Sequence, residues 1–222
     1  LFSITEQVFG LVDQAEEVLS EASQGISGVL RVGADSPYQV MSILRECRRV
    51  HPEINFQVSF GNSQDIAIGL REFKTDVALL SQHQDDPQFY SIIRRHDPLV
   101  AFVNKKHPWA KNKWVRLESF HGQETIRREV GSDTQRAFNG ICEAKLVEPN
   151  YVLEIGSREA LREAVAVGMG VGVIPKSELG NDVRLVAIPI RNSSLELKES
   201  VVCLKTRKNA PLIGAFFRLA QK

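Results

Sequence analysis

Four short stretches of the chain place hydroxyl, amide or carboxylate side chains directly before an expected helix. They are Asp35-Ser36-Pro37-Tyr38, Gly61-Asn62-Ser63-Gln64, Gly131-Ser132-Asp133-Thr134 and Gly156-Ser157. In open α/β sheets, ligands bind at the carboxyl ends of the strands, where the first turn of each following helix presents free backbone amides. Because these amides carry positive partial charge, the chemistry predicted for the four stretches is the binding of a small anion.

Two neighbouring arginines precede the third of these stretches. If Arg127 or Arg128 points toward the ligand, its planar fork could hold a carboxylate, a phosphonate or a sulfonate through two parallel hydrogen bonds. Asp133 weakens this anion site unless its side chain faces solvent. Two other interpretations stay open: the hydroxyl side chains simply cap helices, and the arginines form surface ion pairs.

The residue types needed for catalysis or metal binding do not occur at the required spacing. The five histidines show no metal-ligand spacing, and Cys-x-x-Cys, Gly-x-Ser-x-Gly and phosphate-loop motifs are missing from the sequence. Asp85-Asp86 is interpreted as a solvated turn rather than an acid–base pair. The sequence therefore predicts neither a metal, nor a cofactor, nor an enzyme.

Composition restricts the class of protein further. The 222 residues are 43% hydrophobic and 25% charged, with a formal net charge of +1, as in an ordinary globular protein without a global preference for nucleic acid. No apolar run is long enough to span a membrane, and no secretion signal is visible. The three cysteines are far apart and suit buried positions in a reducing compartment, so a cytoplasmic location is expected.

Hydrophobic patterning predicts the elements that position the four stretches. In the first part of the chain, the expected strands are Gly28–Val32, Ile54–Phe60 and Val77–Leu80, with helices after Pro37 and after Ser63. This strand–helix alternation is typical of a doubly wound parallel sheet.

The second part of the chain continues the α/β pattern. The expected strands are Tyr90–His96, Leu99–Val103, Glu124–Arg128, Val152–Ile155, Val183–Ile188 and Leu195–Leu204, with a helix through residue 144 and a C-terminal helix from Pro211. Between them, Ser157 is the expected cap of another helix, and Gly168 is expected to end it in a left-handed conformation. A buried strand over residues 171–174 then completes one half of a parallel crossover.

Two further segments have more than one interpretation. A heptad pattern at the start predicts either a linker helix that pairs with a second chain or an amphipathic helix packed on its own domain; its apolar positions are Leu1, Ile4, Val8, Leu11, Ala15, Val18 and Ala22. A basic run with two tryptophans could form a nucleic-acid surface, although Pro108 breaks its periodicity; it comprises Lys105, Lys106, Lys111, Lys113 and Arg116 with Trp109 and Trp114.

The stretch from Ser157 to Pro175 resembles the signature near the end of the co-inducer-binding domain of LysR-type transcriptional regulators. Other features fall in the order of that family: the opening from Gly28-Val-Leu-Arg-Val-Gly to Asp76-Val-Ala-Leu, and the later passage Asn104-Lys-Lys-His-Pro-Trp-Ala. Arg128-Glu-Val-Gly-Ser-Asp-Thr also resembles a pattern of some members, Arg-Glu-Pro-Gly-Ser-Gly-Thr-Arg.

The resemblance implies a fold of class α/β, with two Rossmann-like lobes resembling type 2 periplasmic binding proteins and an N-terminal linker helix. The implied divisions are a linker and dimerisation helix over 1–24, regulatory lobe I over 27–103 and 204–222, and regulatory lobe II over 104–203. A small anionic effector (a carboxylate, phosphonate or other oxyanion) is expected between the lobes. The expected effector-binding residues are Asp35, Ser36, Pro37, Tyr38, Asn62, Ser63, Arg127, Arg128, Ser132, Thr134, Ser157 and Ile174.

The implied function is effector sensing and oligomerisation in a transcriptional regulator that assembles as a homodimer or homotetramer. The family reads DNA through an N-terminal winged helix-turn-helix, which these residues do not contain; since the first residue is Leu1, we expect the chain to be a fragment. A phosphonate-associated member is the specific expectation. The alternatives are a solute-binding protein of a transport system and an enzyme on the same fold.

Overall fold

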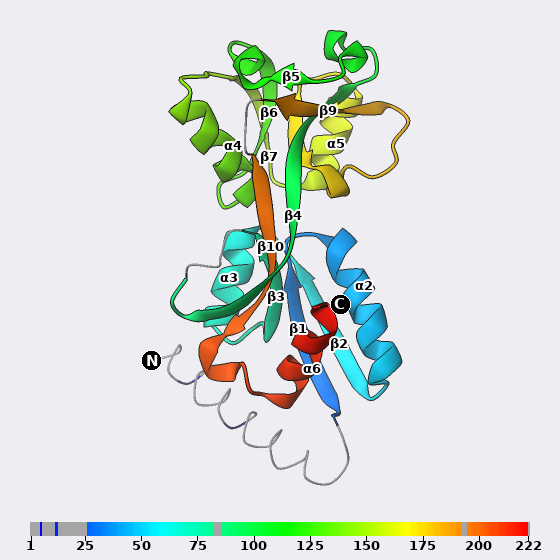
Figure 1. The fold of residues 1–222 in the computed structure, drawn as a ribbon, viewed down its shortest axis with the longest axis vertical. Helices are drawn as coiled ribbons and strands as arrows, with labels where there is room; N and C mark the ends of the chain where they lie inside the picture. Colours follow the sequence, from blue (N-terminus) through cyan, green and yellow to red (C-terminus); the bar gives the residue numbers. More distant parts are fainter. Residues whose placement is uncertain (1–4, 6–11, 13–25, 82–85, 192–194, 222) are drawn as a thin grey trace. The chain divides into compact units, whose positions relative to one another are not determined.

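The computed structural model describes residues 5, 12, 26–81, 86–191 and 195–221. The predicted linker helix over 1–24 lies outside these residues except for Thr5 and Val12, so it stays a prediction. The described residues form two compact units (Figure 1). The first comprises those up to Arg95 and from Lys198 onward, and the second those from His96 to Leu197. These limits lie inside two strands, before the predicted lobe boundaries at 103/104 and 203/204.

The first unit is built on a mostly parallel sheet with the strand order β2-β1-β3-β10. Strand β1 is parallel to β2 and β3, and β10 is antiparallel to β3. The strands are β1 (Gly28–Ala34), β2 (Ile54–Phe60), β3 (Val77–Ser81) and β10 (Glu196–Leu204), and the helices are α2 (Pro37–Val50), α3 (Ser63–Arg71) and α6 (Pro211–Ala220). The predicted doubly wound pattern is confirmed in this unit.

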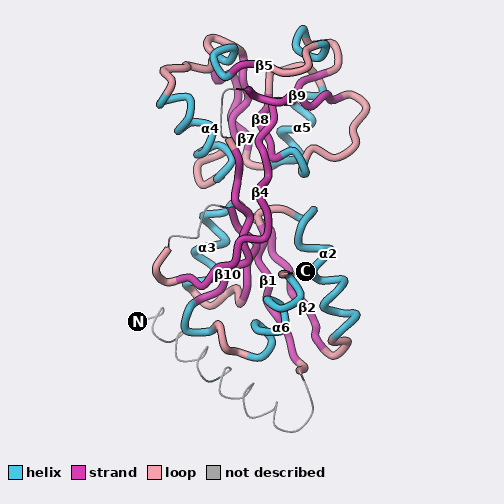
Figure 2. The backbone as a smooth tube through the Cα atoms, in the orientation of Figure 1, coloured by secondary structure: helices cyan, strands magenta, loops and turns pink. Residues whose placement is uncertain are grey.

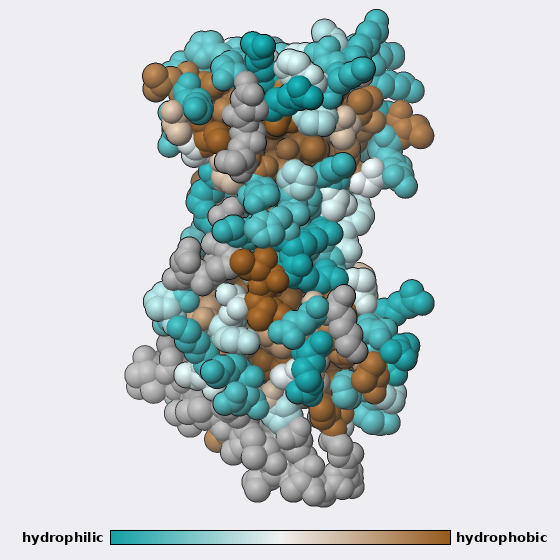
Figure 3. Space-filling model, in the orientation of Figure 1, coloured by the Kyte–Doolittle hydropathy of each residue, from teal (hydrophilic) through white to brown (hydrophobic). Residues whose placement is uncertain are grey.

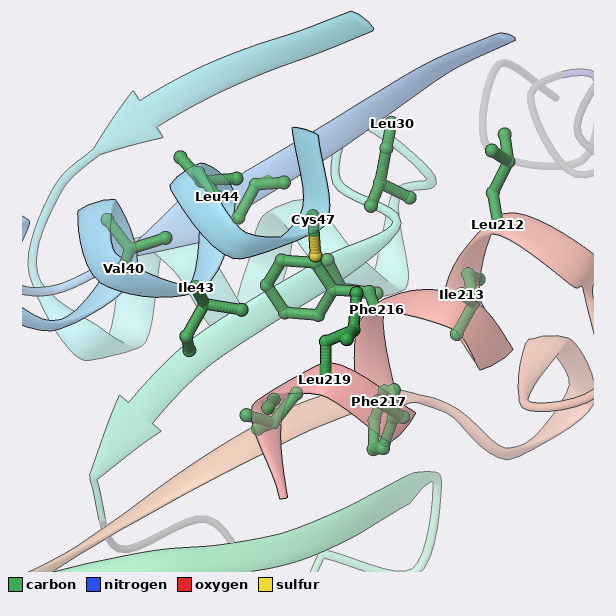
Figure 4. Packing of buried hydrophobic residues seen from close by; sticks show 14 of the residues in the cluster. Leu30, Val40, Ile43, Leu44, Cys47, Leu212, Ile213, Phe216, Phe217 and Leu219 are labelled. Carbon is green, nitrogen blue, oxygen red and sulfur yellow. The ribbon is translucent and has the colours of Figure 1, made fainter. Parts of the chain in front are cut away.

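Both faces of this sheet are covered, which explains why all five residues of β3 are buried. Successive side chains on a strand point to opposite faces. Leu79 therefore joins the cluster with α2 and α6, and Leu80 joins the cluster with α3. Figure 4 shows the first cluster, in which Phe216 of α6 lies against Cys47 of α2.

The second unit combines antiparallel and parallel pairing. Strand β4 is antiparallel to β8 and β9, β5 is parallel to β9, and β6 and β7 form a separate parallel pair. Helices α4 and α5 lie on opposite sides of these strands (Figure 2). The strands are β4 (Phe89–Asn104), β5 (Val115–Arg116), β6 (Glu124–Arg128), β7 (Asn150–Ile155), β8 (Gly172–Pro175) and β9 (Leu185–Arg191), and the helices are α4 (Asp133–Ala144) and α5 (Arg158–Ala166).

Four single turns of 3-10 helix complete the description. They are η1 (Pro108–Lys111), η2 (Leu117–Phe120), η3 (Lys176–Glu178) and η4 (Lys205–Arg207). The turns η1 and η2 flank β5, a two-residue strand that the hydrophobic pattern does not predict. Such a short strand carries too few residues to show a period of two.

The prediction of separate strands over Tyr90–His96 and Leu99–Val103 is wrong, because both belong to the 16-residue strand β4. Pro98 lies within β4, because its fixed φ is compatible with extended backbone wherever its missing amide is not needed. The buried Asp97 before it is held in place, since its carboxylate accepts a hydrogen bond of 2.5 Å from the hydroxyl of Ser177.

The glycine turn after α5 has the predicted form. The hydroxyl of Ser157 accepts the amide proton of Ala160 at 3.1 Å, and Gly168 has the expected positive φ of 90°. The parallel crossover rests on Val171, whose amide and carbonyl bond Glu124 and Ile126 at 2.9 and 2.8 Å. The following strand β8 then pairs antiparallel with β4, so the crossover is followed by a reversal in pairing.

Hydrophilic and hydrophobic residues are interspersed over the visible face of each unit (Figure 3). Within the part of the chain that the structure describes, no helix has the length and apolar character needed to cross a membrane.

Candidate functional site

The first two predicted stretches meet at one edge of the sheet of the first unit. Strands β1, β2 and β3 are parallel, so their carboxyl ends lie at the same edge. The Oδ2 atom of Asp35 accepts a hydrogen bond of 2.8 Å from the hydroxyl of Ser63. It also accepts the amide of Ser81 at 3.4 Å. The structure therefore brings together side chains that lie 28 residues apart in the sequence.

Ser36 is the most unusual residue of this cluster. It occupies the N-cap position of α2 with extended backbone, yet its hydroxyl makes no capping hydrogen bond. The side chain is 1% exposed, and Oγ has no hydrogen-bond partner among the described residues. A buried polar group left without a partner costs about 1–3 kcal/mol. A ligand oxygen at the start of α2 would supply that partner.

The other predicted residues of the first unit surround this point with different exposures. Pro37 is the first residue of α2 and is partly exposed, and Tyr38 is 50% exposed. Asn62 caps α3, because its Oδ1 accepts the amide of Asp65 at 2.9 Å. Ser63 is buried at 2% exposure, so the stretch contributes both a cap and a buried hydroxyl.

The two arginines on β6 point to opposite faces of their strand. Arg127 is exposed, pairs with Glu154 at 2.6 Å and lies over the ring of Tyr151. Arg128 is 6% exposed and holds both carboxylate oxygens of Glu129 at 2.7 and 2.8 Å. Arg127 thus matches the surface ion-pair interpretation, whereas Arg128 is a buried cation whose carboxylate partner is its own neighbour in sequence.

The start of α4 contains two further predicted residues, Ser132 and Thr134, and one of its side chains bonds the backbone of Arg128. Ser132 caps the helix by accepting the amide of Gln135 at 3.4 Å, and Thr134 is 4% exposed. The Gln135 side chain also accepts the backbone amide of Arg128 at 2.9 Å, which ties the end of β6 to the helix. Asp133 does not face solvent; it is buried and paired with Arg136.

The last two predicted residues behave differently from each other. Ser157 caps α5 and is partly exposed, in line with the capping interpretation. Ile174 is 1% exposed and belongs to a hydrophobic cluster with Leu161 and Phe102, so its side chain offers no accessible surface.

Ser81 and Gln135 are the members of these clusters that are missing from the predicted set. Ser81 ends the third strand of the parallel sheet, which is the position where the same carboxyl-end argument applies. Gln135 is one helical residue beyond the predicted Thr134, and its bonds to Arg128, Asn139 and Tyr151 distinguish it from an ordinary surface glutamine.

The described residues contain no group of three or more His, Cys, Asp or Glu side chains that could hold a metal ion. Cys47, Cys142 and Cys203 are free and buried. Burial raises the pKa of Cys47 and of Cys142 to about 11, and that of Cys203 to about 12.

We expect the folded protein to react slowly with a thiol reagent such as Ellman's reagent at pH 8. A pKa raised by two units lowers the reactive thiolate fraction about 100-fold, and burial also blocks access. The measurement compares the rate in buffer with the rate in denaturant, where all three cysteines should react at the ordinary rate. Rapid reaction of a cysteine in the folded state would contradict the buried, inert role of these thiols.

This chain matches a known protein family and several solved structures. The LysR substrate binding domain family model matches residues 23–222. Two relatives are HTH-type transcriptional regulator CysL of Bacillus subtilis, 24% identical over 91% of this chain and 70% of CysL, and HTH-type transcriptional activator CmpR of Synechocystis, 29% identical over 77% of this chain and 57% of CmpR.

Solved structures show the same fold. The regulatory domain of Synechocystis CcmR in complex with 2-PG has a TM-score of 0.81 at 22% identity, covering 88% of this chain and 96% of that one. The effector binding domain of QuiR in complex with shikimate has a TM-score of 0.80 at 20% identity, with the same coverage of 88% and 96%. These matches support an effector-sensing regulator over a solute-binding protein of a transport system, and this chain belongs to the family of LysR substrate-binding domains.

Proposed function

We propose that the chain is the effector-sensing part of a LysR-type regulator, and that its effector is a small oxyanion which also carries a hydrogen-bond donor. The observation that carries the proposal is the buried hydroxyl of Ser36, which has no partner among the described residues and lies at the start of a 14-residue helix. An anionic oxygen placed there would accept the hydroxyl proton and face the positive end of the helix.

The side chain of Asp35 supports the presence of a hydrogen-bond donor on the effector. Its Oδ2 is occupied by Ser63 and by the amide of Ser81, and no partner of Oδ1 is found among the described residues. A carboxylate beside an anion site disfavours a ligand that is only negative. A hydroxyl or ammonium group next to the anionic group would donate to Asp35 and remove that repulsion.

The relatives support the same class of ligand. The QuiR domain is described with shikimate, which is a carboxylate bearing hydroxyl groups, and the CcmR domain with 2-PG. An aminophosphonate would also satisfy both requirements, so the phosphonate expectation stays a prediction. So does the expectation that the effector is held between two lobes.

In the second unit, we propose Arg128 rather than Arg127 as the arginine that responds to the effector. Arg128 is buried next to the start of α4, while Arg127 is exposed and engaged with Glu154. The effector would compete with Glu129 for the Arg128 guanidinium. Such an exchange of carboxylate partners couples ligand binding to a local rearrangement, and a ligand shifts an equilibrium only through such differential contacts.

The activity of the whole regulator is part of the proposal. A cytoplasmic protein would assemble as a homodimer or homotetramer, contact DNA through a winged helix-turn-helix and change transcription when the effector binds. The names of CysL and CmpR, both HTH-type regulators, support this proposal.

A melting screen against small anions tests the proposed ligand class. A ligand at one hundred times its Kd adds about 2.7 kcal/mol to stability, which is about 5–10 °C in melting temperature for a protein of this size. We expect shifts with hydroxylated or aminated carboxylates and phosphonates, and smaller shifts with simple anions such as acetate. Shifts from neutral aromatic compounds alone would contradict the proposal.

The variant Ser36→Ala tests the site itself. Removal of a hydroxyl that bonds a charged ligand costs about 1.5–3 kcal/mol, so we expect affinity to fall about tenfold or more. Stability without ligand should not fall, because the hydroxyl has no partner in the described protein. Ser42→Ala on the same helix is the matched control, since this exposed hydroxyl only bonds the carbonyl of Gln39. Equal affinities for the two variants would place the effector elsewhere.

A further inference from the structure

A surface pocket of about 550 Å³ lies within the second unit, and its lining contains no residue of the proposed effector site. It is formed by η1, β5, η2 and the segment that joins them. Two aromatic rings, three cations and a hydroxyl contribute most of its lining: Trp109, Trp114, Lys111, Lys113, Arg116 and Ser119. Its volume is in the range of small-molecule sites.

The cations of this pocket have no carboxylate partner among the described residues. Lys111, Lys113 and Arg116 are exposed, and the described residues provide no carboxylate within salt-bridge distance of them. By contrast, other arginines of the same unit, such as Arg128 and Arg184, are paired with carboxylates at 2.6–2.7 Å. The pocket is therefore a local excess of positive charge on a chain whose formal net charge is only +1.

A further arginine, which lies over the ring of the pocket residue Trp114, adds to this positive charge. Arg116 and Arg191 are register partners in the parallel pairing of β5 with β9. Like charges placed side by side on a sheet destabilise the pairing. Both guanidinium groups lie over the ring of Trp114, at 5.8 and 4.8 Å from its centroid, which offsets part of that repulsion. An anion bound in the pocket would reduce the rest.

The pocket wall is held by a packed core, so the site is formed before any ligand arrives. The Trp109 ring contacts the buried Phe120 edge-on at a centroid distance of 5.1 Å. The amide of Trp109 also donates to the side chain of His107 at 3.1 Å. Val115 of β5, which precedes Arg116, is buried. A preformed site of this kind loses little conformational entropy on binding.

We propose that this pocket binds a small phosphate ester or polyphosphate with at least two negative charges, as a second ligand of the regulator. A phosphate group presents several strong acceptor oxygens, which match the guanidinium of Arg116, the lysine ammonium groups and the hydroxyl of Ser119. The indole walls would contact the remainder of the ligand. The phosphate compound and the effector would bind to separate sets of residues. One protein could therefore respond to the concentrations of two different metabolites.

Tryptophan fluorescence tests this proposal directly, because the only two tryptophans of the chain, Trp109 and Trp114, both line the pocket. Titration with pyrophosphate at low ionic strength should give a saturable change in emission. Raising the salt concentration should weaken the response, since exposed charges are screened. Arg116→Gln and Arg191→Gln should each raise the half-saturation concentration about tenfold, the loss expected for one charge-assisted hydrogen bond.

Lys145→Gln is the matched control, because Lys145 is an exposed cation of the same unit outside the pocket. It should leave the titration unchanged, and circular dichroism should show a cooperative melting transition for every variant. If either arginine variant fails to fold, Lys111→Gln tests the same pocket.

Three results would overturn the proposal: no saturable response of the wild type, an equal response of the pocket variants, or tighter binding of a polyglutamate peptide than of pyrophosphate. The Ser36 variants are expected to bind pyrophosphate normally, so failure here is separable from failure of the effector site.

Discussion

Replacing Asp76 with asparagine is expected to lower the free energy of unfolding by about 3–5 kcal/mol, the usual cost of breaking a buried ion pair from one side. Asp76 is 4% exposed and receives Arg31 through its backbone amide at 2.8 Å and through two guanidinium nitrogens at 3.0 and 2.8 Å. Arg207, 3% exposed, bonds the same carboxylate. The asparagine variant leaves that buried guanidinium without its counter-charge.

The effect of pH on stability follows from the same carboxylate. Burial raises the pKa of Asp76, but the hydrogen bonds from Arg31 and the positive charges of Arg207 and Arg31 outweigh it, so the pKa lies below its ordinary value of 3.8. A lowered pKa contributes stability that is complete above about pH 4 and is lost as pH falls through the folded-state pKa. The wild type should therefore lose stability more steeply than the asparagine variant in this acid range.

Denaturant unfolding followed by circular dichroism at pH 7 and in the acid range measures both effects. Hydrogen exchange should locate the loss in the first unit, where β1, β3 and η4 meet at Asp76. Glu46→Gln is the control, because Glu46 pairs with Arg49 on the exposed face of α2 and such pairs contribute little. If both variants have the same stability, the buried network is not a major stabilising element.

The second large effect is expected for Gly172→Ala in strand β8. A Cβ at this position would overlap the ring of Phe102, the register partner of Gly172 on β4, and would lie 3.0 Å from a methyl group of Val165. Phe102 is completely buried, so its ring has no room to move. Overpacking of a core costs about 1–3 kcal/mol, and we expect the upper end of that range.

Gly140→Ala is the same chemical change in the same unit with the opposite expectation. Gly140 lies inside α4, and a Cβ there meets nothing within 4 Å. Alanine should stabilise the helix by about 0.5–1 kcal/mol, because glycine loses more backbone entropy on folding. Urea denaturation of both variants measures the contrast.

Adding Phe102→Leu to the Gly172→Ala variant identifies the cause. If the ring overlap is responsible, the double variant should lose less stability than the sum of the single variants. Additive losses would show that the Phe102 ring does not cause the destabilisation by Gly172→Ala.

Local features of this protein could be predicted from the sequence because they depend on neighbours within a few residues. Ser132, Ser157 and Asn62 cap their helices by accepting an amide three residues ahead. Gly168 takes the left-handed conformation that ends α5. The parallel order of the first three strands also follows from the short helices between them. These features were sufficient to place the hydroxyl-bearing helix starts of the candidate site.

Other features depend on contacts between distant parts of the chain. The sequence suggested two strands where Pro98 lies, and only the pairing of β4 with β8 and β9 makes them one. The sequence could not separate Arg127 from Arg128, because which face of β6 is buried depends on what packs against it.

Three features of the candidate sites also depend on the tertiary structure. They are the burial of the Ser36 hydroxyl, the hydrogen bond between Asp35 and Ser63, and the pairing of Arg116 with Arg191. The sequence by itself determined the helices, most of the strands and which polar residues begin the helices, since hydrogen bonds within a turn are encoded by adjacent residues. Only the tertiary structure decided which of those polar groups are already satisfied and which still need a ligand. The hydrogen bond between Asp35 and Ser63, for example, joins side chains 28 residues apart in the sequence.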